Sequence, residues 1–113
     1  MYTLFVDDER NPADVSWMAI PFVGETVVVR SYNEFVDTIL ERGLPAHVSF
    51  DYDLADFEED GKELTGYHCA KWLVGQCIDH RNMIPSYTVH SMNPIGKINI
   101  REYIDWAVSV LEF

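Results

Sequence analysis

Basic residues are scarce in this 113-residue sequence: eight Lys and Arg stand against nineteen Asp and Glu, so the formal net charge is -11. A chain this acidic lacks the basic surface that binds long nucleic acids through counterion release. Anionic membrane surfaces should repel it as well. If the protein handles phosphate groups, we expect a bound cation, and not a basic groove, to attract them.

Long apolar runs and glycine-rich loops are also missing. No window approaches the roughly 18 apolar residues of a membrane span, and no glycine spacing matches a Walker-type phosphate loop. The N-terminus reaches two acids after six residues, without a basic start, so we expect no targeting signal and no membrane partner. The only cysteines, Cys69 and Cys77, lie about 12 Å apart along one predicted helix, beyond disulfide reach. Buried free thiols in a reducing, cytoplasmic compartment fit this pattern.

Apolar material is ample, with 48% hydrophobic and 13% aromatic residues, and the length suits a single domain over residues 1–113. Four short segments rich in β-branched and aromatic residues predict strands that are buried on both faces. They are Tyr2–Val6, Thr26–Arg30, His47–Phe50 and Ser86–His90.

Segments with helical periodicity alternate with these strands. Asn11–Met18 predicts a short helix, and a capping box at Ser31–Glu34 begins a longer one that Gly43 ends. Further helices are predicted for about Thr65–His80 and from about Asn99 to the C-terminus.

The alternation of strands and helices predicts an α/β fold. We expect a small flavodoxin-like three-layer sandwich, with a parallel sheet of about four strands in the order 2-1-3-4 and helices on both faces. In such folds ligands bind beyond the carboxyl ends of the strands, near the switch point between the first and third strands.

Acidic and polar residues gather at these predicted strand ends. Asp7 and Asp8 follow the first strand, Asp51 and Asp53 follow the third, and His90 ends the fourth. Carboxylates held close together repel and raise one another's pKa values, and a divalent cation relieves that repulsion. Hard oxygen ligands without cysteine favour Mg²⁺, Mn²⁺ or Ca²⁺ over zinc. We therefore expect Mg²⁺ or Mn²⁺ at Asp7, Asp8 and Asp51.

Simpler interpretations exist for each part of this pattern. An isolated Asp-Asp pair more often begins a turn or caps a helix; the arrival of Asp51 from a separate strand favours the metal site. The Asp51-Tyr52-Asp53 segment also echoes an EF-hand loop, but Asp56 occupies the position that needs glycine. It echoes the Asp-x-Asp of haloacid-dehalogenase phosphatases too, although there the pair follows the first strand.

The acidic pair and the later aspartate resemble response-regulator receiver domains, in which such a trio binds Mg²⁺ and the third-strand aspartate accepts a phosphoryl group. Ordinary receivers have a lysine-bearing segment before a fifth strand, which is not predicted here, and this argues against a phosphoacceptor. The closer resemblance is to cyclic-phosphate processing receiver domains, a receiver-derived family. It rests on four segments in the family's order: Leu4–Pro12, Val48–Leu54, Thr65–Tyr67 and His90–Gly96.

That resemblance implies the handling of cyclic phosphate ends in the context of RNA repair. Many relatives carry histidine between the two third-strand aspartates, where this chain has Tyr52. If that histidine is the acid or base of the reaction, His90 is left to act alone here.

Together these features predict a metal-dependent phosphoesterase that acts on a small cyclic phosphate or an RNA end. In catalysis, His90 would transfer a proton, and Asp51 would help to hold the cation that activates the attacking water. The residues expected to bind the substrate are Arg10, Asp53, Ser91, Asn93, Gly96 and Lys97. The alternative is a receiver-like binding module that senses or sequesters a phosphorylated ligand or partner without turnover.

Three expectations concern exposure. The segment Asp51–Glu63 carries seven acids in thirteen residues and should be an exposed, mobile loop. Tyr67 and Trp72 should be surface or rim features. His90 should face a cleft, so that truncating it costs less than about 1 kcal/mol of stability, whereas His47 is expected to be structural.

Overall fold

The computed structural model describes residues 1–111 of the chain. Its main sheet contains four parallel strands in the order β2-β1-β3-β6. The strands are β1 (Tyr2–Val6), β2 (Glu25–Val29), β3 (His47–Phe50) and β6 (Ser86–Val89). Because β4 and β5 form a separate hairpin, β6 is the fourth strand of this sheet. The predicted α/β fold and strand order are therefore confirmed.

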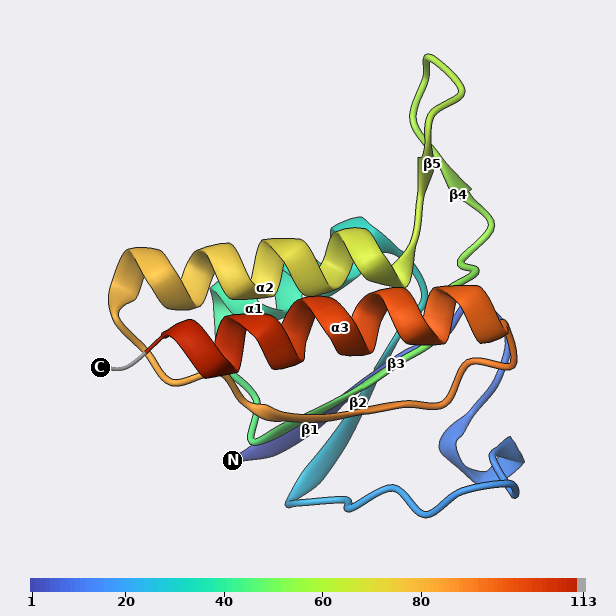
Figure 1. Ribbon diagram of the computed structural model, residues 1–113. Helices are drawn as coiled ribbons and strands as arrows, with labels where there is room; N and C mark the ends of the chain where they lie inside the picture. Colours follow the sequence, from blue (N-terminus) through green and yellow to red (C-terminus); the bar gives the residue numbers. More distant parts are fainter. Residues whose placement is uncertain (112–113) are drawn as a thin grey trace.

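Three α-helices cover one face of the sheet (Figure 1). They are α1 (Tyr32–Arg42), α2 (Gly66–His80) and α3 (Pro94–Val110). Successive crossovers from β2 to β3 and from β3 to β6 run in the same direction across the sheet, and right-handed connections then place α1 and α2 on the same side.

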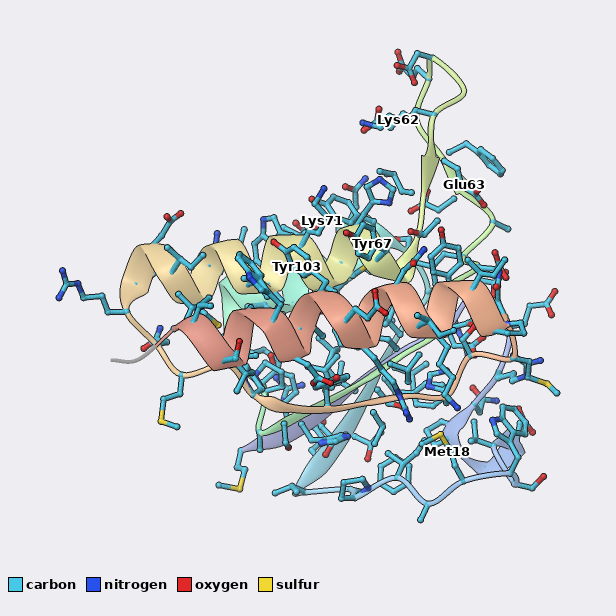
Figure 2. The ribbon with its side chains drawn as sticks, viewed as in Figure 1. Met18, Lys62, Glu63, Tyr67, Lys71 and Tyr103 are labelled. Atoms are coloured by element: carbon cyan, nitrogen blue, oxygen red, sulfur yellow. The ribbon has the colours of Figure 1, made fainter. Side chains whose placement is uncertain are left out.

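In the part of the chain that the structure describes, the opposite face carries no α-helix, although we expected helices on both faces. The connection from β1 to β2 runs back across the sheet on that side, and Figure 2 shows Met18 in it, away from the helices. Within the predicted helix Asn11–Met18 only the 3-10 turn η1 (Pro12–Asp14) forms, and none of its residues is buried. Capping signals alone did not make a helix here because the segment has no apolar stripe to bury.

The two faces of the sheet differ in chemistry because side chains alternate along each strand. Leu4 and Val6 of β1 join the apolar core under the helices, as do Val48 and Phe50 of β3. The alternate positions face the other way and are largely polar. Those that are buried include Thr3, His47 and Ser49.

Helix α3 begins about five residues earlier than predicted. The side chain of Asn93 accepts a hydrogen bond from the Gly96 amide at 3.0 Å, and Pro94 occupies the first turn. Proline suits this position because its missing N–H is not needed there. The Asn93-Pro94 pair, which alone indicates a turn, is thus the cap of a helix whose start lies beside the strand ends.

The acidic segment after β3 is a hairpin rather than an irregular loop. Its strands β4 (Asp56–Phe57) and β5 (Glu63–Leu64) pair antiparallel, and the hairpin projects away from the body of the domain (Figure 1). The acids at its tip are exposed as expected, but Asp51 and Leu54 at its base are buried. The expectation of exposure was therefore wrong for Asp51; mobility of the tip remains a prediction.

Two further expectations concern α2. Cys69 and Cys77 are free and buried, as predicted. Tyr67 and Trp72 are half-buried against the edge of the core, which fits the expectation of surface or rim positions. Tyr67 meets Tyr103 of α3 edge to face, with ring centroids 5.7 Å apart (Figure 2). No helix in residues 1–111 is long and apolar enough to cross a membrane.

Candidate metal centre

Three carboxylates meet where β1 and β3 end side by side. Asp7 follows the last residue of β1, Asp8 is next to it, and Asp51 follows the last residue of β3. One carboxylate oxygen from each residue lies within 4.8 Å of the other two. The structure thus brings together the three predicted metal ligands. Asp7 and Asp51 are buried, whereas Asp8 is half-buried.

The turn after β1 wraps around the Asp7 carboxylate. Oδ1 of Asp7 accepts hydrogen bonds from the backbone amides of Glu9 at 2.9 Å and Arg10 at 2.7 Å. From the end of β2, Arg30 donates to the carbonyls of Asp7 at 3.1 Å and Arg10 at 2.6 Å. Arg30 was not among the predicted site residues, although it directly follows β2, the strand next to β1. Its guanidinium fixes the turn, and so the position of Asp7 and Asp8.

The electrostatics of the cluster reflect mutual repulsion. Burial raises the pKa of Asp51, the negative charge of Asp7 adds to this, and the value reaches about 6. Burial and the charge of Asp7 also raise the pKa of Asp8. For Asp7 burial again favours the protonated form, but hydrogen bonds from His90 and from two backbone amides outweigh it and lower the pKa.

The donor set fits a hard divalent cation. All three ligands are carboxylates, and the nearby histidine already engages both of its ring nitrogens. Oδ1 of Asp7 accepts two amides, so Oδ2 is the atom with a lone pair left for an ion. Mg²⁺ and Mn²⁺ take such oxygen ligands and complete their shells with water and substrate oxygens.

A polar pocket of about 490 Å³ opens over the carboxylates, at the carboxyl ends of the strands. Four of the six predicted substrate-binding residues line it: Arg10, Asp53, Ser91 and Asn93. Gly96 and Lys97 do not line it. The Gly96 amide is occupied by the helix cap, and a Cβ at Gly96 would lie 2.2 Å from the ring of Tyr52. Gly96 therefore serves packing and the cap of α3, and substrate binding by Gly96 and Lys97 stays a prediction.

Among residues 1–111, Arg10 is the one cationic side chain that lines this pocket. Its guanidinium lies 5.2 Å from the centre of the Trp17 ring, and Nη2 lies 3.6 Å from Sδ of Met92. Nη1 is 3.8 Å from Oδ2 of Asp7. Also in the lining of the pocket, Nδ2 of Asn93 donates to Oδ2 of Asp53 at 3.1 Å. The pocket thus combines one guanidinium, one amide and several carboxylates.

His90 is buried, which corrects the expectation that it faces a cleft. Its side chain has no exposed surface, and its ring stacks on Phe5 with centroids 4.3 Å apart. Nε2 lies 3.0 Å from Oδ2 of Asp7 and Nδ1 lies 2.7 Å from Oγ of Ser49. His90 follows Val89, whose side chain joins the core under the helices, so its own side chain points to the helix-free face. Both nitrogens are engaged, so His90 acts on the site through Asp7.

The Thr65-Gly66-Tyr67 segment shapes the end of β3. A Cβ at Gly66 would lie 1.8 Å from the carbonyl oxygen of Asp51, so only glycine fits at this close approach. The Gly66 amide donates to the carbonyl of Tyr52 at 2.8 Å. Tyr52 itself packs toward α3 and does not line the pocket.

The remaining histidines lie outside the pocket. His47 is buried, as expected for a structural residue, and burial lowers its pKa. Nδ1 of His68 accepts a hydrogen bond from the Thr65 amide at 3.0 Å and completes the capping box of α2.

The pKa of Asp51 predicts how the cation-free protein responds to pH. Folded Asp51 holds its proton up to about pH 6, whereas its ordinary pKa is 3.8. Between these values the folded state binds more protons than the unfolded state, so stability falls as the pH rises. Asp51→Asn should remove this loss and be more stable than wild type by about 3 kcal/mol at pH 7.5 in chelator.

Urea denaturation at pH 4.5 and 7.5 measures this difference. Asp53→Asn, two residues along and exposed, makes the same change of charge and should show no such gain. A gain that is equal in both variants would point to overall net charge instead of repulsion at Asp51.

Comparison with known proteins gives a family. The profile described as the cyclic-phosphate processing receiver domain matches residues 2–106. Searches of curated proteins and of solved structures each gave no match. The profile spans all four strands of the sheet, the three carboxylates and most of α3. The chain belongs to the cyclic-phosphate processing receiver domain family.

Proposed function

We propose that this domain hydrolyses a cyclic phosphate with a divalent cation, Mg²⁺ or Mn²⁺, held by Asp7, Asp8 and Asp51. The observation that carries the proposal is the convergence of these carboxylates within 4.8 Å beneath a pocket that Arg10 lines. The family's description supports a cyclic phosphate as the substrate class. The small size of the pocket suits a nucleotide or an RNA end, and the acidic surface disfavours a long nucleic acid.

In the proposed reaction each residue of the pocket has a separate role. A bound cation would polarise the phosphate and lower the pKa of an attacking water. Arg10 binds a phosphate oxygen through a charge-assisted hydrogen bond. Asn93 and Ser91 orient hydroxyl groups of the substrate. Because His90 is buried, proton transfer falls to a carboxylate in the pocket, and we assign it to Asp53, which Asn93 holds at 3.1 Å.

A second candidate is a binding module that sequesters a phosphorylated ligand without turnover. The burial of His90 favours it, since no imidazole of the described residues lines the pocket to act as general acid. Both candidates share the cation and Arg10, and they differ only in whether the ester bond is cleaved.

The test is a screen of labelled 2′,3′-cyclic, 3′- and 5′-phosphate ends and cyclic dinucleotides with Mg²⁺ or Mn²⁺. Hydrolysis of a cyclic phosphate that chelator abolishes supports the esterase. Cation-dependent binding without product supports the binding module. Neither binding nor turnover of any phosphate would contradict both.

Arg10→Gln should weaken binding of the active phosphate by about 10- to 100-fold, the usual worth of one hydrogen bond to a charged group. Arg101→Gln makes the same change of charge on the exposed side of α3 and should leave binding unchanged. Equal effects of the two variants would show that overall charge, and not contact with the phosphate, is responsible.

A further inference from the structure

A line of polar side chains leads away from the metal centre across the helix-free face of the sheet. It starts at Asp7, whose Oδ2 is 3.0 Å from Nε2 of His90. Nδ1 of His90 is 2.7 Å from Oγ of Ser49, and Oγ1 of Thr88 donates to that oxygen at 2.9 Å. Asp7, His90 and Ser49 are fully buried.

The line continues to the amino end of β3. Nε2 of His47 is 3.1 Å from Oγ1 of Thr88, and Nδ1 of His47 is 2.8 Å from Oγ of Ser86. His47 is almost completely buried, whereas Ser86 is exposed. We call the five residues from His90 to Ser86 the polar chain: His90, Ser49, Thr88, His47 and Ser86.

Counting protons gives this chain a direction. Each hydroxyl and each neutral imidazole has one proton to donate. The Asp7 carboxylate can only accept, so Nε2 of His90 carries the proton and Nδ1 must accept from Ser49. Ser49 then accepts from Thr88, which is the direction that the geometry gives.

The same rule fixes the other histidine. Thr88 has used its proton on Ser49, so Oγ1 must accept from Nε2–H of His47. Nδ1 of His47 then carries no proton and is an acceptor for the hydroxyl of Ser86, which also lies 3.1 Å from the carbonyl of Ala46 as a second acceptor. From His47 to Asp7 every contact is satisfied with both imidazoles neutral, and these donors point towards Asp7. The one proton of Ser86 has two acceptors, Nδ1 of His47 and the carbonyl of Ala46.

We propose that the polar chain is a positioning device for the metal centre: it fixes the Nε2–H tautomer of His90 and so keeps that N–H on Oδ2 of Asp7. The donated hydrogen bond orients the carboxylate for a cation, as outer partners of metal ligands do. On this account His47, at the far end of the chain, is a positioning residue. The predicted effect of His47 on cation binding rests on the proposed function, whereas the predicted tautomers of the two histidines are independent of it.

Nitrogen-15 NMR of the two imidazoles tests the direction, because a protonated ring nitrogen and a bare one differ in chemical shift. In cation-free wild-type protein we expect protons on Nε2 of both His90 and His47. A proton on Nδ1 of either ring would overturn the proposal, since the chain would then run the other way. The tautomers are measured without cation, so the result tests the direction of the polar chain even if the proposed function is wrong.

Thr88→Val breaks the chain with little change of shape. His47 then has no acceptor at Nε2 and should shift to its Nδ1–H form, which donates to Ser86. Ser49 loses the proton that Thr88 supplied, and Mn²⁺ affinity should fall by about 10-fold, as for other outer-sphere changes. Thr88→Ser keeps a hydroxyl and should restore both the tautomer and the affinity.

Thr3→Val is the matched control. It removes an equivalent hydroxyl from the same face of the sheet, where Thr3 bonds to the backbone of Val23 outside the chain. It should lower stability without moving either tautomer or the Mn²⁺ affinity. If Thr88→Val and Thr3→Val behave alike in both measurements, the polar chain has a structural role only and the proposal is overturned.

Discussion

Replacing His90 with alanine is expected to lower the free energy of unfolding by about 3–5 kcal/mol. The imidazole is fully buried and stacks on Phe5 at 4.3 Å, so truncation leaves a cavity. It also removes a donor to the buried Asp7 carboxylate and the partner of Ser49. A buried polar group that loses its hydrogen bond destabilises the folded state by its full desolvation penalty. This penalty adds to the destabilisation caused by the cavity.

Urea denaturation of His90→Ala and wild type at one pH measures this loss. His80→Ala, an exposed histidine at the end of α2, is the control and should change stability by less than about 0.5 kcal/mol. A loss below about 1 kcal/mol in His90→Ala would mean that the side chain faces solvent, as the sequence alone suggested. It would contradict the buried arrangement on which the polar chain depends.

The strand order could be predicted because few topologies satisfy an alternation of short buried strands and helices. The same rules place the residues after β1 and β3 next to each other, so the approach of Asp7 and Asp51 could be foreseen. This inference needs only the direction of neighbouring strands, and no detail of any side chain. The positions of the carboxylates could therefore be predicted from the sequence, whereas most of their hydrogen-bond partners, which depend on side-chain detail, could not.

The polar side chains of the helix-free face were not predicted, although the alternation of residues in β3 indicates them. In β3 and the residue after it, His47, Ser49 and Asp51 alternate with Val48 and Phe50. We treated this segment as an apolar run buried on both sides. A period of two with polar residues at every second position instead indicates one apolar and one polar face. Counting that alternation would have placed His47 and Ser49 on the face of the sheet opposite the apolar core.

Contacts that depend on loop conformation could not be foreseen. Arg30 reaches the carbonyls of the turn after β1 only because that turn folds around Asp7. The hairpin after β3 likewise turns an acidic segment into two short strands, with Asp51 buried at its base. Such arrangements arise from many weak local preferences, which a single sequence does not rank.

Replacing Asp51 with alanine is expected to lower Mg²⁺ or Mn²⁺ affinity by at least about 100-fold, more than the loss of an outer-sphere partner. Asp51 supplies one of only three carboxylates in the cluster, and it comes from a different strand from the other two. Its loss leaves Asp7 and Asp8, which are adjacent in sequence and cannot enclose an ion from two sides. Asp53→Ala removes the same charge from the rim of the pocket and should keep the affinity.

Calorimetric titration of cation-free wild type with Mn²⁺ tests the central claim, which is that the three carboxylates form one cation site. We predict a single site per chain that is absent in Asp51→Ala and present in Asp53→Ala. Because the ion displaces protons from the cluster, binding at pH 7.5 should be tighter than at pH 5.5, below the Asp51 pKa of about 6. Unchanged Mn²⁺ affinity in Asp51→Ala, or no binding by wild type at pH 7.5, would contradict the account.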